Sequence, residues 1–115
     1  MEVPDALQAA ECPIVRFNAL VGGKYKLRIL WELRRDPRRY SELQRALTVA
    51  LGGRAITPRV LSRELRELAA SGLVTRKQFA VIPPRVEYRL TDKGRALGGV
   101  MRSICRWGER PVRAR

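Results

Sequence analysis

The chain of 115 residues has the length of a single domain, and its 24 Lys and Arg residues against 11 Asp and Glu residues give a formal net charge of +13. Such an excess of positive charge predicts a polyanionic partner, and nucleic acid is the first candidate. No apolar run is long enough to span a bilayer, no signal-peptide pattern opens the chain, and two cysteines without other secretory features predict a reducing cytoplasm.

The chain opens with an acidic segment, residues 1–11, which we expect to be a loosely held lead-in. A first helix is predicted to begin near Pro13 and to end at the Gly22-Gly23 pair, because adjacent glycines break helices. The apolar side of this helix is expected to consist of Ile14, Val15, Phe17, Leu20 and Val21.

Two further helices are predicted before the middle of the chain. The first covers residues 24–35 and is stopped by Asp36-Pro37. Residues 39–40 are expected to form a very short strand beside a hairpin. Ser41 is predicted to cap the next helix, with Glu42 supporting its first turn, and this helix runs to the following Gly-Gly pair.

The helix that follows has the most informative pattern in the chain. Thr57 is a good N-cap, Pro58 suits the first helical position, and Gly72 suits the position after the helix end. Leucines recur at helical spacing on one face and arginines on the opposite face. We therefore predict a helix that packs on a core and presents guanidinium groups outward. The two faces are Leu61, Leu65 and Leu68 against Arg59, Arg63 and Arg66.

Strand-like runs come next, over residues 73–79 and 86–90, around a tip at residues 80–84. Thr91 is then predicted to cap one last helix over residues 92–107. A basic-faced helix followed by a hairpin is typical of a winged helix-turn-helix. The predicted fold class is α+β, mainly α, with flanking N- and C-terminal helices that dimerise.

The groove geometry of DNA assigns roles to the basic-faced helix, because a helix fits the major groove and its N-terminal half reaches base edges. Arg59 or Arg63 is predicted to bind guanine, and Ser62 and Arg66 to bind phosphate or bases. Thr57 and the first N–H groups of the helix are candidates for holding a phosphate.

The hairpin adds three candidate contacts. Arg76 and Lys77 on one strand, and Arg85 at the tip, are predicted to lie over the adjacent minor groove or the DNA backbone. Solvated surface is the alternative interpretation for each of them.

Four blocks of the sequence resemble the HxlR family of winged helix-turn-helix regulators, which is related in fold to the MarR regulators. The resemblance implies a homodimeric bacterial transcription factor that binds a roughly palindromic operator, with a family domain over residues 12–108 and a basic tail over 109–115. The stretch from Leu47 to Thr57 departs from the family, whose members pass between these helices in a few residues. The blocks are CPIVRFNALVGGKYKLRILWELRR, RRYSELQRAL, TPRVLSRELRELAASGLVTRKQF and PPRVEYRLTDKGRAL.

The two cysteines are candidates for redox sensing. Cys12 precedes Pro13 at a helix start, where the helix dipole favours a thiolate. It matches the N-terminal cysteine that senses oxidants or electrophiles in several HxlR members, and a small buried apolar residue is the alternative interpretation. The family also implies an inter-subunit partner, for which Cys105 is the candidate.

Dimerisation is predicted through the first and last helices. The apolar seam of the last helix has no obvious partner within one chain, so a second copy is expected to cover it. The predicted interface residues are Phe17, Leu20, Leu97, Val100, Met101 and Ile104.

Other classes of function fit the sequence less well. The chain has no histidine, no G-x-S-x-G motif, no glycine-rich phosphate loop and no clustered metal ligands, so we expect no enzyme, no cofactor and no metal site. The predicted function is therefore a DNA-binding transcriptional regulator, a repressor with an electrophile or small-molecule effector. Two alternatives are a non-sequence-specific nucleic-acid-binding protein and a winged-helix protein-interaction module.

Overall fold

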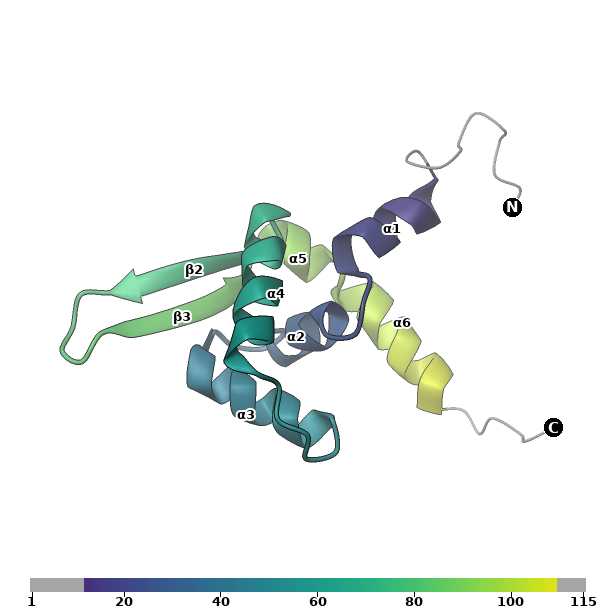
Figure 1. Cartoon of the computed structure of the whole chain (residues 1–115). Helices are drawn as coiled ribbons and strands as arrows, with labels where there is room; N and C mark the ends of the chain where they lie inside the picture. Colours follow the sequence, from purple (N-terminus) through teal and green to yellow (C-terminus); the bar gives the residue numbers. More distant parts are fainter. Residues whose placement is uncertain (1–11, 110–115) are drawn as a thin grey trace.

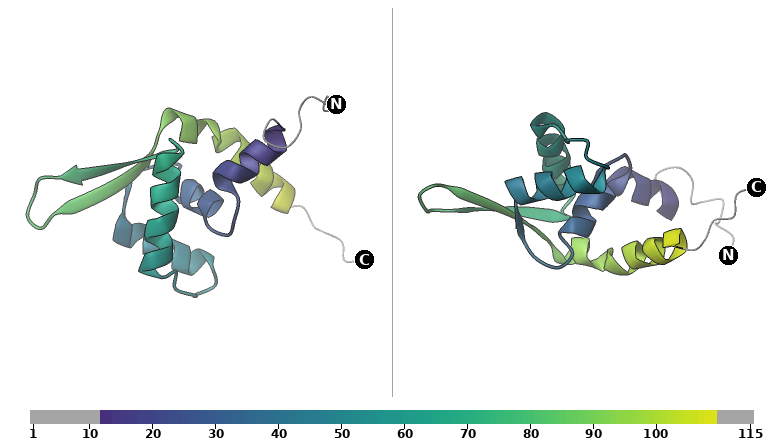
Figure 2. Two further views of the ribbon diagram at one scale, coloured as in Figure 1. Left: turned by 45° about the horizontal axis from the view of Figure 1, so that its top comes forward. Right: turned by 90° about the horizontal axis from the view of Figure 1, so that it is seen from below.

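Helices gather around the base of a long hairpin, which projects from one end of the molecule (Figure 1). The structure is a computed structural model that describes residues 12–109. Figure 2 shows that the first and last helices lie at the end opposite the hairpin. The elements are α1 (Pro13–Val21), α2 (Lys26–Glu32), β1 (Arg38–Arg39), α3 (Tyr40–Ala50), α4 (Pro58–Ala70), β2 (Val74–Phe79), β3 (Arg85–Leu90), α5 (Asp92–Ala96) and α6 (Gly98–Glu109).

The core lies where α2, α3 and α4 pack together and meet the base of the hairpin. Each of these helices contributes fully buried leucine or isoleucine side chains at helical spacing, so burial of apolar area stabilises their packing. The predicted leucine face of α4 is confirmed. The largest buried side chains are Val21, Ile29, Leu30, Leu43, Leu47, Leu61, Leu65, Leu68, Leu73 and Val74.

The hairpin and β1 form a three-stranded antiparallel sheet in the order β1-β3-β2. Val74 pairs with Leu90 at the base, and Phe79 pairs with Arg85 near the tip. The predicted short strand is confirmed, shifted by one residue, because Arg38 pairs with Tyr88 in β3. The β1 strand therefore anchors the start of α3 beside the hairpin.

The second helix is shorter than predicted, covering residues 26–32 rather than 24–35. Arginines after its end satisfy carbonyl groups that another helical turn would otherwise bind. Arg34 Nη1 donates to the Trp31 carbonyl at 2.8 Å, and Arg38 Nε donates to the Glu32 carbonyl at 3.2 Å. The guanidinium of Arg34 also lies 3.8 Å from the ring centroid of Trp31. These contacts end the helix before Asp36-Pro37.

The predicted Ser41 cap of the third helix is wrong. Arg39 occupies the N-cap position and α3 begins at Tyr40, so Ser41 is already helical. The Glu42 carboxylate accepts a hydrogen bond from the backbone N–H of Arg39 at 2.8 Å. Glu42 therefore stabilises the helix start as predicted, but from one turn within the helix.

The predicted single helix over residues 92–107 is also wrong, because Leu97 separates α5 from α6. The Thr91 cap is confirmed, since its hydroxyl accepts from the N–H of Gly94 at 3.0 Å. A Cβ at Gly94 would lie 2.2 Å from the Leu73 carbonyl oxygen, so only glycine lets α5 pack against the hairpin base. Gly98 starts α6 in a new direction, and Met101 enters the core.

None of the helices over residues 12–109 is both long and apolar enough to cross a membrane.

Candidate DNA-binding surface

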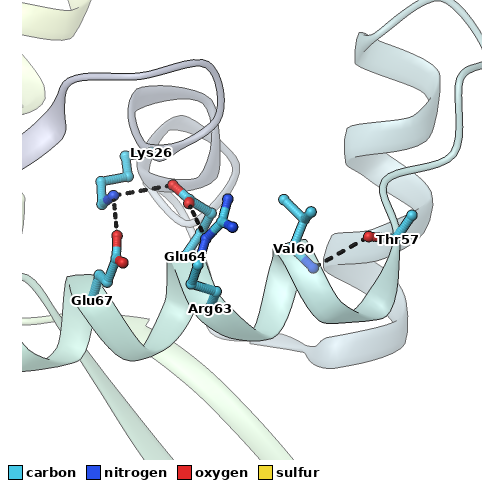
Figure 3. Close-up of polar contacts among 6 residues, drawn as sticks. All are labelled: Lys26, Thr57, Val60, Arg63, Glu64 and Glu67. Carbon is cyan, nitrogen blue, oxygen red and sulfur yellow. Dashed lines mark hydrogen bonds and ion pairs between the residues drawn. The ribbon is translucent and has the colours of Figure 1, made fainter.

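The arginine face of α4 is exposed. Thr57 caps the helix, its hydroxyl accepting from the N–H of Val60 at 3.2 Å (Figure 3). The predicted guanidinium stripe of Arg59, Arg63 and Arg66 lies on the solvent side, opposite the buried leucines. This side of α4 offers three cations spaced along nearly two helical turns.

The hydroxyl of Ser62 has a partner within the chain. The Tyr40 hydroxyl lies 3.2 Å from Ser62 Oγ and donates to the Pro58 carbonyl at 3.0 Å. Ser62 is half-buried in this contact between α3 and α4. Tyr40 therefore holds the first turn of α4 in place, which sequence reasoning missed because the contact spans 22 residues.

An ion-pair cluster joins α2 to α4, and Figure 3 shows it. Lys26 Nζ lies 3.1 Å from Glu64 Oε1 and 2.5 Å from Glu67 Oε1. The hydrogen bond to Glu67, with help from Glu64, raises the pKa of Lys26 against the opposing effect of its burial. The same hydrogen bond lowers the pKa of Glu67. Lowering the pH through the depressed pKa of Glu67 protonates its carboxylate and removes the ion pair with Lys26. The stability that this pair contributes is fully present only above the ordinary pKa of a glutamate.

One member of the cluster also contacts the arginine face. Glu64 is the single buried charged residue among residues 12–109, with 6% of its surface exposed. Its Oε2 lies 3.3 Å from Nε of Arg63. The sequence did not predict that Glu64 pairs with both Lys26 and Arg63, because a glutamate beside the leucine face is usually an ordinary exposed residue.

The connection between α3 and α4, which was expected from the sequence to be long, is anchored to the core. Ile56 is buried, and its carbonyl accepts from Gln44 Nε2 at 3.1 Å. Gly52 and Gly53 both take positive φ angles, which let the chain turn back after α3. Hydrogen bonds from α3 therefore hold the chain at the start of α4: Gln44 donates to the Ile56 carbonyl and Tyr40 to the Pro58 carbonyl.

The hairpin carries its three predicted basic residues in different settings. Arg76 and Lys77 are exposed and point to opposite faces, as adjacent residues of a strand must. Arg85 is not at the tip: it is the first residue of β3, half-buried, with its guanidinium 4.5 Å from the ring centroid of Phe79. Lys77 Nζ lies 5.0 Å from the same ring, so two cations flank one aromatic side chain.

The tip of the hairpin is apolar rather than basic. Val81 and Ile82 are exposed there, and Ile82 is 99% exposed.

The predicted dimer residues divide into two groups. Val100 and Ile104 on α6 are exposed, whereas Phe17, Leu20 and Leu97 are half-buried against the core. Met101 is 3% exposed within a single chain, so the prediction that it lacks an intramolecular partner is wrong. It turns inward because α6 begins after the break at Leu97. The predicted dimer residues leave out three other exposed apolar side chains of these two helices, which are Ile14, Val15 and Trp107.

The two cysteines lie on the terminal helices and both are half-buried thiols. Cys12 is the N-cap of α1, and its side chain makes no capping hydrogen bond. Cys105 on α6 lines a shallow groove with Leu27, Trp31 and Ile104. Over residues 12–109, no group of three or more Cys, Asp or Glu side chains is placed to hold a metal ion.

Comparisons with known proteins agree with this arrangement. The sequence matches the HxlR-like helix-turn-helix family over residues 20–115. It is 43% identical over 91 residues to a helix-turn-helix transcriptional regulator of Halalkalibacterium halodurans, covering 78% of this chain and 75% of the relative.

Solved structures show the same fold. A transcriptional regulator of the MarR family from Porphyromonas gingivalis superposes with a TM-score of 0.81 and 31% identity, over 97% of this chain and 100% of the other. The redox regulator HypR in its oxidised form has a TM-score of 0.78 and 33% identity, over 90% of this chain and 100% of the other. With a capped, arginine-faced helix beside a hairpin and these matches, the chain belongs to the HxlR-like helix-turn-helix family and is a DNA-binding transcriptional regulator with a winged helix-turn-helix fold.

Proposed function

We propose that this regulator is a homodimer that binds a palindromic operator by placing α4 of each subunit in the major groove. The observation that carries the proposal is the exposed arginine face of α4, on a helix whose other face is locked into the core. A dimer on a promoter excludes polymerase without further parts, so we propose repression. The regulator would bind chromosomal DNA in the cytoplasm. We propose no catalytic activity for it.

The proposed contacts follow from the position of each side chain. Arg59 and Arg63, in the first two turns of α4, are assigned to base edges, and Arg66, one turn further, to phosphate. Thr57 and the first N–H groups of α4 are assigned to a phosphate. Ser62 is assigned to phosphate or a base through its hydroxyl, which also lies 3.2 Å from the Tyr40 hydroxyl.

The hairpin is assigned to the DNA flanking each half-site. Arg76 and Lys77 are exposed on β2 and are assigned to phosphates. Arg85, stacked beside Phe79, adds positive charge and holds the arm in shape. These contacts raise affinity for any duplex and carry little sequence information.

Selection of duplexes from a random pool tests the proposal. We expect a palindromic consensus whose half-sites are about one helical turn apart, bound at least about a thousandfold more tightly than random duplex at fixed salt. A pool that yields no consensus would mean a non-sequence-specific nucleic-acid-binding protein. If replacing all three arginines of α4 with neutral residues left binding to a partner protein unchanged, the chain would instead be a protein-interaction module. Transcription in vitro from a promoter carrying the consensus separates repression from activation.

Oxidant sensing by Cys12 is the finer part of the proposal. Two features support it: the thiol lies at the positive end of α1 without a capping hydrogen bond, and the similar protein HypR is named a redox regulator. Modification at α1 would change the spacing of the two recognition helices, to which operator binding is sensitive. Cys105 of the second subunit is the proposed partner for a disulfide.

Titration with diamide is expected to release the wild-type protein from its operator, while Cys12→Ser stays bound. Cys105→Ser is the matched control: it should prevent the inter-subunit disulfide on a non-reducing gel but leave Cys12 as the first thiol modified. Release of Cys12→Ser at the same diamide concentration as wild type would show that Cys12 is structural. An electrophile such as a quinone, used in the same titration, tests the wider class of effector.

A further inference from the structure

We propose that Glu64 is a positioning residue for base reading, which aims the guanidinium of Arg63 into the major groove. The inference rests on the proposed function of α4. It starts from the contact between Arg63 Nε and Glu64 Oε2 at 3.3 Å, on a carboxylate that the core and α2 surround.

The geometry suits a guanidinium that reads guanine end-on. Arg63 is exposed, and over residues 12–109 its Nε makes the contact with Glu64 while its two Nη groups form no hydrogen bond. Two free Nη groups on a held guanidinium are the donors that a bidentate contact to guanine O6 and N7 requires. The Nε contact therefore restricts the side chain without using the atoms that would meet the base.

Lys26 makes this arrangement compatible with a polyanionic ligand. A bare glutamate beside the arginine face would repel DNA phosphates, and an unpaired buried carboxylate is costly. Lys26 Nζ contacts Glu64 Oε1 at 3.1 Å, leaving Oε2 directed at Arg63 (Figure 3). Lys26, Arg63, Glu64 and Glu67 together have no net charge, so the cluster orients one arginine without lowering the positive charge that the other arginines supply.

Arg59 and Arg66 contrast with Arg63. Neither has a carboxylate partner within 4.0 Å among residues 12–109, so no ion pair restricts either side chain before DNA binds. Ordering a long side chain on binding costs affinity, and a side chain ordered in advance avoids that cost. Arg63 is accordingly the arginine on which the preference for one base pair should depend most.

The variant Glu64→Gln tests the inference, because it keeps the size of the side chain and removes its charge. On the consensus duplex, we expect it to weaken binding about two- to tenfold. It should also flatten the preference at the base pair that Arg63 reads, leaving preferences at other positions unchanged. In an Arg63→Ala background, Glu64→Gln should have no further effect on DNA affinity.

Glu67→Gln is the matched control, since it removes the other carboxylate partner of Lys26 without touching Arg63. It should leave the base preference intact. A purely structural role for Glu64 would weaken binding to all duplexes equally and would persist in the Arg63→Ala background, and that outcome would overturn the inference. Arg63→Ala alone keeping full operator affinity would instead refute the proposed function.

A measurement on the unmodified protein covers the case in which Glu64→Gln does not fold. The Nε–H signal of Arg63 in a nitrogen-15 NMR spectrum, assigned with Arg63→Lys, should exchange with water more slowly than the corresponding signals of Arg59 and Arg66. Equal exchange at the three arginines would contradict the proposed positioning.

Discussion

An aspartate in place of Ile104 is expected to dissociate the proposed dimer and to weaken binding to a palindromic duplex about a hundredfold or more. Ile104 is 43% exposed on α6, near the exposed side chains of Val100 and Trp107 and at the same end of the molecule as Ile14 on α1. A charge buried in an apolar interface is costly to desolvate. Two linked subunits bind a palindrome with an effective concentration that separate subunits lack. Sedimentation and duplex titration measure the two losses.

Met101 would be a poor choice for this test, because its burial within one chain means that a charge there would unfold the protein. Val49→Asp is the control for oligomeric state, since Val49 is 79% exposed and belongs to α3 rather than to either terminal helix. It should stay dimeric, and both variants should keep the helical circular dichroism of the wild type. A wild-type protein that sediments as a monomer at micromolar concentration would refute the proposed dimer.

Replacing Arg63 with alanine is expected to cost about 1–3 kcal/mol on the consensus duplex and to relax the preference at one base position. The loss follows from the two guanidinium donors that end-on guanine recognition uses. Binding to random duplex should fall much less, because phosphate contacts supply that affinity. Titrations of the consensus and of single-base variants, all at one salt concentration, measure both effects.

Arg102→Ala is the control for net charge, because Arg102 is an exposed arginine on α6 and not on α4. It should lower affinity slightly and equally for every duplex. Arg85→Ala should likewise weaken binding to specific and random DNA alike, since its side chain lies on Phe79 in the hairpin arm. Full operator affinity in Arg63→Ala would show that α4 is not the recognition helix.

Local features of the sequence were enough to predict α4 and the hairpin. Thr57, Pro58 and Gly72 mark the helix ends through the conformations and hydrogen bonds of single residues. The alternation of leucine and arginine faces then indicates which side is buried. These are short-range properties, so no knowledge of the rest of the fold was needed.

Prediction was weaker at the ends of α2 and α5, where the helix stops although the helical pattern of apolar residues continues. The seven-residue α2 ends where Arg34 and Arg38 donate to its carbonyls, and the five-residue α5, which packs against the backbone of Leu73 at Gly94, ends at Ala96. Helical periodicity continues through both breaks, because it reports which residues are apolar and not where the chain turns. For the same reason Met101 was assigned to a dimer seam, although it enters the core of its own subunit.

Residue types at fixed spacing were enough to predict the fold class, the basic face of α4 and the family. The side chains that hold α4 in place could not be predicted in this way, because they come from other helices. Lys26 meets Glu64 across 38 residues and Tyr40 meets Ser62 across 22. Such pairs form when α2 and α3 pack against α4, so the burial of leucines by the core places polar groups together that no local pattern connects.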